Sequence, residues 1–423
     1  MNRTLLSALL LSTALLAPPA LADEATAWRL FVSDHERGTV TVLDAEDGSV
    51  LDTVETQGPA SLHRTSGGET VFAVQGPTGR VAAIASGIAF ADHGDHADIE
   101  IGEPRALDFA MEGEKPAHFV ERQGLIAQWF DGEPQARFVS ERGVLDGSGE
   151  VRTIDVGAPH HGVAVPYADH AVVTIPNPED ASQRPIGARI VGFDGAQVGQ
   201  DIACPGLHGS AGSGSLYALA CETGILLISE EGGVPDVRHL AYPDTLPEGS
   251  SSTLIGGRGL QYFVGNYGPD RLVVIDPSAD GAFTLVQLPT RRVHFAVDPI
   301  RPRFAYVITE DGQLHRLDVL DGAIAGSLRV TDPYSMDGHW SDPRPRLAVA
   351  GDEILVTDPL KGVVHRIDAE SFEPAGEIEI GGRPFNIVSV GGSGALHGAD
   401  EAHGHADGHG HEDGEAHDGH DHD

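Results

Sequence analysis

Histidine returns at one place in a repeated unit of this chain. The four residues concerned each lie a few positions after a proline and shortly before an apolar run typical of a strand; they are His63, His118, His161 and His208. Imidazole nitrogens bind zinc at about 2.0–2.1 Å, and a zinc site needs about three or four N, O or S donors in a tetrahedral arrangement. If the repeated units close into a ring, these histidines face one another. The sequence therefore predicts a metal site that several repeats build together.

Three further histidines are candidates for the same site. His294 and His339 occupy a similar place in later units, and His160 directly precedes His161. A lone histidine at such a place is more often hydrogen-bonded in a channel or packed under a turn than a metal ligand. Repetition favours the metal site, because each buried ring would otherwise need polar partners of its own. The carboxylates that could complete the set are Asp108, Glu112 and Asp337.

The elements that must position these histidines recur at intervals of roughly 40 to 55 residues, a period typical of a propeller or a solenoid. Eight short runs of β-favouring residues begin near Arg29, Thr70, Gly124, His170, Ser215, Gln261, Arg303 and Glu353. Behind most of them comes a turn rich in Gly, Asp or Pro and then a second run that ends in aspartate. Short strands between such turns, with hardly any amphipathic helical stretch, indicate all-β blades.

We therefore predict one all-β domain, a β-propeller, over residues 23–392. Eight blades fit the repeat, and seven remain the alternative because the segments 84–114 and 131–152 follow the period poorly. The first strand of each blade in a propeller lies innermost and lines the central channel. Histidines at the starts of the blades are thus expected to converge on that channel from different blades.

Residues 1–22 have the layout of a cleaved secretory signal rather than of a blade. Arg3 precedes the apolar stretch from Leu5 to Leu16, and small residues close the segment at Ala20 and Ala22. No other apolar run approaches the roughly 20 residues that a membrane span needs. We expect a soluble, exported protein of the bacterial periplasm, without membrane insertion.

The two cysteines suit an oxidising compartment. Cys204 and Cys221 flank the hairpin expected in the fifth unit. Folding that hairpin about Gly212 and Ser213 places Cys204 opposite Cys221 and His208 opposite Tyr217. We predict a disulfide, with two buried free thiols as the alternative.

The net charge of −37 restricts the partners of this chain. A polyanion is repelled by phosphate backbones and by anionic lipid surfaces, so nucleic acid is excluded as an expected ligand. Cations, or the basic face of a partner protein, are the natural complement.

A second concentration of histidine lies in the C-terminal segment 393–423, which is expected to be disordered because its residues 397–423 include none able to build a core. Mixed imidazole and carboxylate donors suit zinc better than calcium or magnesium, although nickel or copper would also bind. A solvated acidic tail is the alternative. A shorter histidine-containing segment lies in a Gly- and Asp-rich insertion, where an ordinary polar loop is as much expected as a metal site. The secondary ligand candidates are His93 and His96 in the insertion and His397, His403, His405, His409, His411, His417, His420 and His422 in the tail.

The chain resembles the AztD-type periplasmic zinc metallochaperones, secreted β-propellers that hand zinc to the solute-binding protein of a zinc ABC importer. The resemblance lies in the opening WRLFVSDHERGTVTVLDAEDGSVLDT from Trp28 to Thr53, in the histidine-bearing blade starts and in the His- and Asp-rich segment. It implies a high-affinity Zn²⁺ site in the propeller and a flexible segment that captures or passes the metal. The ligands that it implies are His63, His118, His161 and His208, with His35 and His294 as further candidates.

Two other functions compete with zinc delivery. Secreted propellers include metal-dependent lactonases, and three histidines with an open fourth position are compatible with a catalytic zinc. The sequence lacks the G-x-S-x-G, G-x-G-x-x-G, G-x-x-x-x-G-K-[ST] and C-x-x-C-H motifs, so we expect no enzyme. The other competitor is a protein-interaction propeller whose tail buffers metal. Because histidine ligands must be neutral, we expect zinc affinity to fall from about pH 7.5 to about pH 5.5.

Overall fold

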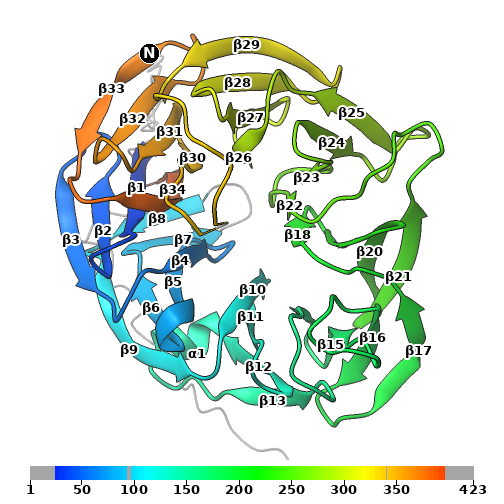
Figure 1. Cartoon of the computed structure of the whole chain (residues 1–423). Helices are drawn as coiled ribbons and strands as arrows, with labels where there is room; N and C mark the ends of the chain where they lie inside the picture. The colour runs from blue at the N-terminus through cyan, green and yellow to red at the C-terminus, as the bar shows by residue number, and fades with distance from the viewer. Residues whose placement is uncertain (1–23, 93–96, 340, 396–423) are drawn as a thin grey trace, which may run out of the picture.

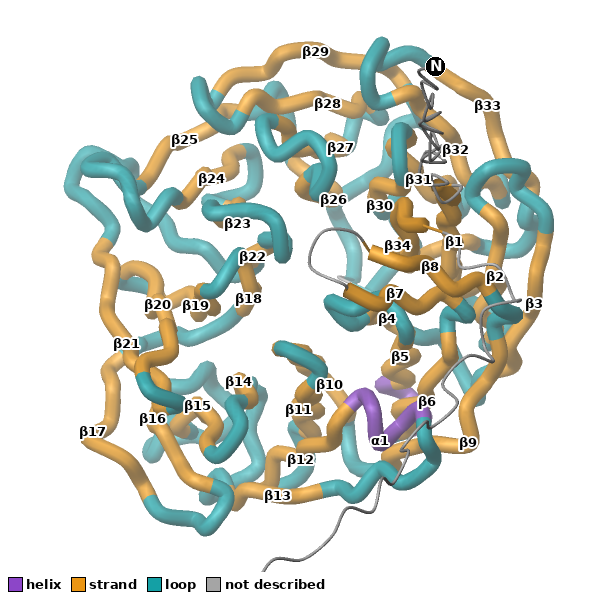
Figure 2. The backbone as a smooth tube through the Cα atoms, turned by 180° about the vertical axis from the view of Figure 1, so that it is seen from behind, coloured by secondary structure: helices purple, strands orange, loops and turns teal. Residues whose placement is uncertain are grey.

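The computed structural model describes residues 24–92, 97–339 and 341–395 and shows eight sheets in a ring around a central channel (Figure 1). The prediction of an all-β propeller with eight blades is confirmed. Seen from behind, the described part of the chain is nearly all strand and loop, and the short helix α1 (Glu141–Leu145) lies beside the second and third blades (Figure 2). Within the described part of the chain, no helix is long and apolar enough to cross a membrane.

Each blade has four main strands, named here from the channel outward. Blade 1 contains β34 (Pro384–Ala395), β1 (Glu24–Asp34), β2 (Thr39–Asp44) and β3 (Val50–Glu55). Blade 2 contains β4 (Ser61–Arg64), β5 (Thr70–Gln75), β6 (Arg80–Ala85) and β9 (Arg105–Glu112). Blade 3 contains β10 (Pro116–Arg122), β11 (Leu125–Phe130), β12 (Gln135–Ser140) and β13 (Arg152–Asp155). Blade 4 contains β14 (Ala164–Pro166), β15 (His170–Ile175), β16 (Gly187–Gly192) and β17 (Gln197–Ala203).

The second half of the ring follows the same plan. Blade 5 contains β18 (Ser210–Ser213), β19 (Leu216–Cys221), β20 (Gly224–Glu231) and β21 (Val234–Ala241). Blade 6 contains β22 (Leu254–Ile255), β23 (Phe263–Asn266), β24 (Arg271–Ile275) and β25 (Phe283–Gln287). Blade 7 contains β26 (Arg292–Val297), β27 (Phe304–Thr309), β28 (Gln313–Asp318) and β29 (Ala323–Arg329). Blade 8 contains β30 (Leu347–Ala350), β31 (Glu353–Asp358), β32 (Val363–Asp368) and β33 (Pro374–Glu379).

The eight apolar runs predicted from the sequence are the second strands of the blades. These strands are covered on both faces by neighbouring blades, which is why they read as continuous apolar runs rather than as alternating ones. All six residues of β5 are buried, whereas β29 at the outer rim alternates between exposed and half-buried residues. The largest fully buried side chains, among them Trp129 and Tyr167, pack in the cores between blades.

The ring closes because the two ends of the described chain share blade 1. The C-terminal strand β34 pairs antiparallel with β1 over a long register that includes Leu30 opposite Ser389. This pairing makes β34 the innermost strand of the blade that the N-terminal strands complete. The hydrogen bonds of one sheet therefore hold the circle shut.

Two insertions explain why parts of the sequence follow the repeat poorly. The hairpin of β7 (Ile88–Asp92) and β8 (Ala97–Ile101) separates β6 from β9 and joins blade 1, where β8 pairs with β34. The short helix α1 (Glu141–Leu145) separates β12 from β13, and the Ser140 hydroxyl accepts a hydrogen bond from the Gly143 N–H at its start. A single 3-10 turn, η1 (Gly76–Thr78), follows β5.

The predicted disulfide is confirmed, since Cys204 is bonded to Cys221 and both residues are buried. The predicted register of the hairpin is wrong, because Tyr217 lies opposite Gly212 and not opposite His208. The chain turns two residues later than expected, at Gly214, whose φ of 56° suits glycine. Cys204 follows the outer strand of blade 4 and donates its N–H to Ile186, so the disulfide ties blade 4 to blade 5.

Candidate metal centre

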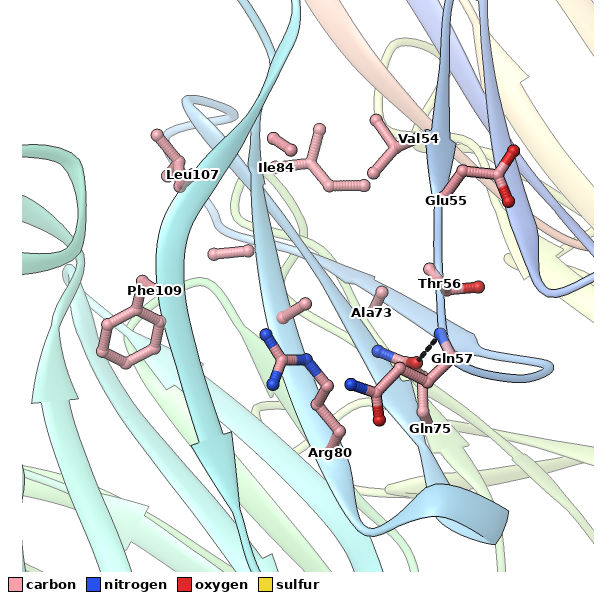
Figure 3. Close-up of a pocket in the computed structure, with 13 residues that line it drawn as sticks. Val54, Glu55, Thr56, Gln57, Ala73, Gln75, Arg80, Ile84, Leu107 and Phe109 are labelled. Carbon is pink, nitrogen blue, oxygen red and sulfur yellow. Dashed lines mark hydrogen bonds between the residues drawn. The ribbon is translucent and has the colours of Figure 1, made fainter.

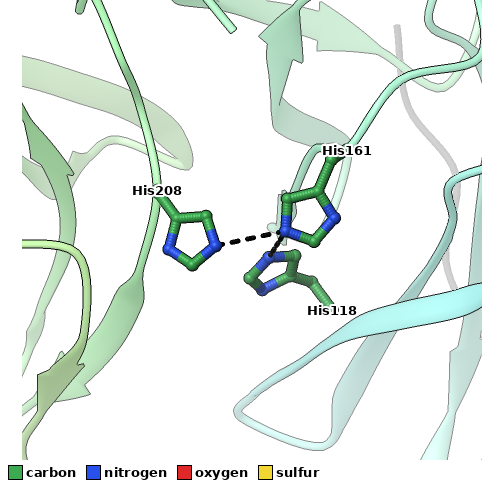
Figure 4. A group of neighbouring side chains, drawn as sticks. All are labelled: His118, His161 and His208. Carbon is green, nitrogen blue, oxygen red and sulfur yellow. Dashed lines mark hydrogen bonds between the residues drawn. The ribbon is translucent and has the colours of Figure 1, made fainter. Parts of the chain in front are cut away.

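Three histidines from three consecutive blades meet at the channel. His118 belongs to β10, and His161 and His208 lie just before β14 and β18, the innermost strands of blades 4 and 5. One ring nitrogen of each lies within 4.8 Å of the others. Figure 4 shows the three rings pointing toward one another from separate elements. We call His118, His161 and His208 the triad.

The spacing of the triad suits a tetrahedral zinc ion. The Nε2 atom of His161 lies 3.1 Å from Nε2 of His118 and 3.2 Å from Nε2 of His208. With Zn–N bonds of about 2.0–2.1 Å, tetrahedral geometry separates two ligand nitrogens by about 3.3 Å. The side chain of His161 is 39% exposed, so an ion can reach the triad from solvent.

Hydrogen bonds on the far side of two rings fix their tautomers. The Nδ1 atom of His208 lies 2.6 Å from the carbonyl oxygen of Ser252, which can only accept, so Nδ1 carries the proton. The Nδ1 atom of His161 lies 2.6 Å from a carboxylate oxygen of Asp131 and donates in the same way. In the neutral rings both Nε2 atoms therefore carry no proton, and their lone pairs face and repel each other. A cation placed between the two nitrogens would attract both lone pairs.

Burial keeps the ligands in the form that binds metal. Burial, and after it the neighbouring histidines, lower the pKa of His118 to about 3. Burial also lowers the pKa of His208, although the hydrogen bond to Ser252 acts in the opposite direction. Both rings are consequently neutral near pH 7, where a neutral imidazole is the metal ligand.

The backbone partner of His208 is itself held in place. Asn266 is buried at the end of β23, and its side-chain oxygen accepts from the N–H groups of Ser252 and Thr253 at 2.8 and 2.6 Å. Its side-chain NH₂ group donates to the Ser252 hydroxyl at 3.0 Å. Asn266 thus orients the loop of blade 6 whose carbonyl fixes the ring of His208.

The sequence did not single out Asp131 as the carboxylate of this site. Of the three candidates, Asp108 is exposed on the outer strand β9, Glu112 pairs with Arg80 at 2.6 Å, and Asp337 pairs with Arg291 at 2.9 Å. Asp131 lies in the turn after β11, beside the segment that begins the next blade. An aspartate in the turn after the second strand of one blade, next to the histidine that begins the following blade, is the sequence signal that could have identified Asp131.

The comparisons with known proteins agree with this architecture. The chain is 60% identical over 396 residues to the protein named zinc chaperone AztD from Citrobacter koseri, which covers 93% of this chain and 94% of that protein. The crystal structure of Citrobacter koseri AztD matches with a TM-score of 0.87 at 60% identity, over 88% of this chain and 100% of that chain. The structure of the apo form gives a TM-score of 0.85 at 59% identity over the same shares.

The chain belongs to the AztD family. No family model matches its sequence. The dihydro-heme d1 dehydrogenase NirN matches with a TM-score of 0.54 at 13% identity, over 85% of this chain and 74% of that chain. At that identity the likeness shows the propeller fold alone.

In this AztD-family chain, His63 lies beside the triad without joining the close group of donor atoms. It belongs to β4, and its ring stacks on Phe119 with centroids 5.1 Å apart. Burial lowers its pKa to about 4. His160 has both nitrogens engaged, Nδ1 with the carbonyl of Ala158 at 2.7 Å and Nε2 with the hydroxyl of Thr174 at 2.9 Å. Its ring supports the turn that carries His161.

The remaining predicted ligands of the AztD-family propeller lie away from the triad. His294 is on β26 in blade 7, where its Nδ1 accepts the Leu347 N–H at 3.1 Å. His339 is exposed before β30, and its Nδ1 lies 2.7 Å from the Ser341 hydroxyl. His35 packs edge-on against Phe385. The candidates His93, His96 and those of the tail lie outside the described residues.

A cavity of about 210 Å³ lies between blades 1 and 2 (Figure 3). Its wall includes Val54, Gln57 and Arg80, and the side-chain oxygen of Gln75 accepts the Gln57 N–H at 2.7 Å. None of the triad residues lines it. This cavity is therefore separate from the candidate metal centre of the AztD-family fold.

Proposed function

We propose that this chain binds a Zn²⁺ ion through the Nε2 atoms of the triad and delivers it, as cargo, to the solute-binding protein of a zinc ABC importer. The observation that carries the proposal is the pair of bare Nε2 atoms of His161 and His208, 3.2 Å apart with both tautomers fixed from behind. Histidine ligands commonly donate their other N–H to a carboxylate or a carbonyl in this way. The name zinc chaperone, given to the 60% identical relative, supports the same cargo.

Delivery is proposed to take place in the periplasm. The Cys204–Cys221 disulfide suits an oxidising compartment, and the pattern of residues 1–22 suits export through a cleavable signal. The charge of −37 favours a partner with a basic face and disfavours nucleic acid and membrane surfaces. The histidines of segment 397–423 are proposed to capture or pass on the ion.

The test of the tight site is a zinc titration against a competing chelator. The mature chain is compared with and without residues 397–423, and each triad histidine is replaced by alanine in turn. His239→Ala is the matched control, because His239 is exposed on the outer strand β21. One tight equivalent that survives truncation and disappears in the triad variants supports the proposal. Loss of all tight binding on truncation would place the site in the tail instead.

Transfer is tested separately from binding. The zinc-loaded chain is mixed with the metal-free solute-binding protein in the presence of a chelator that would trap any free ion. Direct delivery predicts that the solute-binding protein becomes loaded while the chelator stays empty. Zinc that appears first on the chelator would refute delivery and leave a buffering protein.

The proposed role requires no turnover of a substrate. Three histidines with an open fourth position are also the ligand set of a hydrolytic zinc, so the zinc-loaded chain should be assayed with generic lactones and esters. We expect the zinc-loaded chain to hydrolyse these lactones and esters no faster than the His208→Ala variant does. A zinc-dependent rate that the variant lacks would favour the hydrolase.

A further inference from the structure

A second cavity lies within the channel, next to the triad. It measures about 410 Å³, and its walls come mainly from the innermost strands of blades 1, 2, 3, 5 and 6, with Tyr217 of the second strand of blade 5. Phe119, which follows His118 in β10, forms part of the wall and stacks on His63. The cavity therefore adjoins His118 along β10, but none of the three triad residues lines it.

Two charged residues line this cavity, Arg64 and Glu121. Among the described residues, the guanidinium group of Arg64 has no hydrogen bond and no ion pair within 4.0 Å, although it lines the cavity. The side chain is exposed to the channel, yet protein atoms crowd it enough that burial lowers its pKa.

The nearest acidic group does not neutralise the cavity by direct contact. Glu121 also lines it, and its charge acts against the lowering of the Arg64 pKa. Its two oxygens accept from the Ser66 N–H at 2.7 Å, the Ser66 hydroxyl at 3.1 Å and the Gly124 N–H at 2.7 Å. The carboxylate is thus occupied by the turns after β4 and β10, and the five N–H donors of Arg64 remain available to a ligand.

Apolar side chains form part of the wall. Leu62, Phe119, Ile255 and Val388 contribute aliphatic and aromatic surface, and His63 is neutral because burial lowers its pKa to about 4. Guanidinium groups bind carboxylates with two parallel hydrogen bonds, and small-molecule sites combine apolar walls with a few fixed polar groups. We propose that this cavity binds a small organic acid, with its carboxylate on Arg64 and its apolar body against Phe119, Ile255 and Val388.

The site goes beyond zinc delivery and does not depend on it, so it is tested on metal-free protein. Calorimetric titration of the full chain compares benzoate with two probes of the same size, neutral benzamide and cationic benzylamine, at constant ionic strength. We expect benzoate to bind with a dissociation constant on the order of a millimolar or tighter and the other two at least about tenfold more weakly. Equal binding of benzoate and benzamide, tighter binding of benzylamine, or no binding of benzoate would overturn the proposal.

Variants then locate the benzoate. Arg64→Met should weaken benzoate binding at least about tenfold. Arg64→Lys keeps the charge but not the bidentate hydrogen-bonding geometry, so it should weaken benzoate binding less. Arg142→Met is the control, because Arg142 is exposed on α1 and pairs with Asp146. Unchanged zinc affinity in the Arg64 variants shows that they are folded. Benzoate affinity that survives Arg64→Met, or falls equally in Arg142→Met, would place the acid elsewhere.

Discussion

Histidines begin the innermost strands on both sides of the channel, but the backbone gives them opposite tautomers. In blade 5, His208 donates from Nδ1 to the carbonyl of Ser252, which leaves Nε2 open to a metal. In blade 7, His294 accepts the Leu347 N–H at Nδ1, so its proton lies on Nε2. The repeat alone does not make a histidine a ligand. The direction of one hydrogen bond decides which nitrogen is available.

The charged residues next to the histidines also differ between the two sides of the channel, and they too favour a metal ion beside His161 rather than beside His294. His161 is backed by the carboxylate of Asp131, whereas His294 lies near Arg346, which lowers its pKa after burial has lowered it most. The guanidinium of Arg346 stacks over Phe385 and has no ion pair within the described ranges. A divalent cation is attracted to the first side and repelled from the second.

The largest expected effect is the loss of a triad ligand. Replacing His161 with alanine removes the nitrogen that lies closest to both other donors, so the zinc dissociation constant should rise on the order of 100-fold or more. His294→Ala should change the dissociation constant less than about threefold, because Nδ1 of His294 accepts a hydrogen bond and Nε2 carries the proton. Chelator competition on protein lacking residues 397–423 measures both. Equal losses in the two variants would mean that the tautomers do not distinguish the two sides.

A smaller effect is expected from the carboxylate behind the triad. Asp131→Asn keeps the shape of the side chain but removes the negative charge that accepts the Nδ1–H of His161 and orients its ring. Zinc affinity should fall about 10- to 100-fold, the range found when such supporting groups are changed. The control is Asp194→Asn, which removes the same charge from an exposed turn of blade 4. An equal fall in the control would assign the effect to net charge rather than to position.

The dependence on pH separates the propeller from the tail. A proton competes with zinc only when the pH approaches the pKa of the ligand, and the pKa of His118 is lowered to about 3. His208 shifts in the same direction. Between about pH 7.5 and pH 5.5 the ring of His118 stays neutral and His208 takes up less proton than an unperturbed imidazole, whose pKa of about 6.5 lies inside this range.

We therefore expect the zinc affinity of the truncated chain to fall less over this range than the affinity of the additional ions bound by the full chain. Parallel titrations of both forms at the two pH values give the comparison. An equal fall in both forms would contradict the effect of burial on the triad. This expectation refines the uniform decrease that histidine content alone predicts.

The sequence locates the second strands well and the site only in part. Blade-centre strands such as β5 are apolar throughout, so their composition reveals them. The innermost strands are short and irregular, and β22 has only two residues, so their pattern carries little signal. His161 and His208 even lie outside the strands that they precede. Their place after a proline was the stronger clue.

What the sequence does not contain is the contact between neighbouring blades. Asp131 meets His161 across 30 positions, and Ser252 meets His208 across 44, because ring closure brings the turn of one blade against the start of another. These contacts decide which ring nitrogen of each histidine carries the proton. Residue type and spacing alone therefore do not reveal that His208 and His294 have opposite tautomers.

The smallest effect should come from the residue that holds the partner of His208. Asn266→Ala removes the acceptor that orients the N–H groups of Ser252 and Thr253, so the carbonyl that fixes His208 becomes less well placed. Zinc affinity should fall by a few-fold, less than about tenfold, and the loss of buried hydrogen bonds should lower the melting temperature.

Asn386→Ala is the matched control on the other side of the ring. Asn386 accepts the Leu62 N–H at 2.9 Å and so joins blade 1 to the strand that carries His63, away from the three donors. Both variants should lose comparable thermal stability, but only Asn266→Ala should weaken zinc binding. If both weaken it equally, general loosening of the ring accounts for the loss. If neither does, the ring of His208 is held by the metal itself rather than by the loop of blade 6.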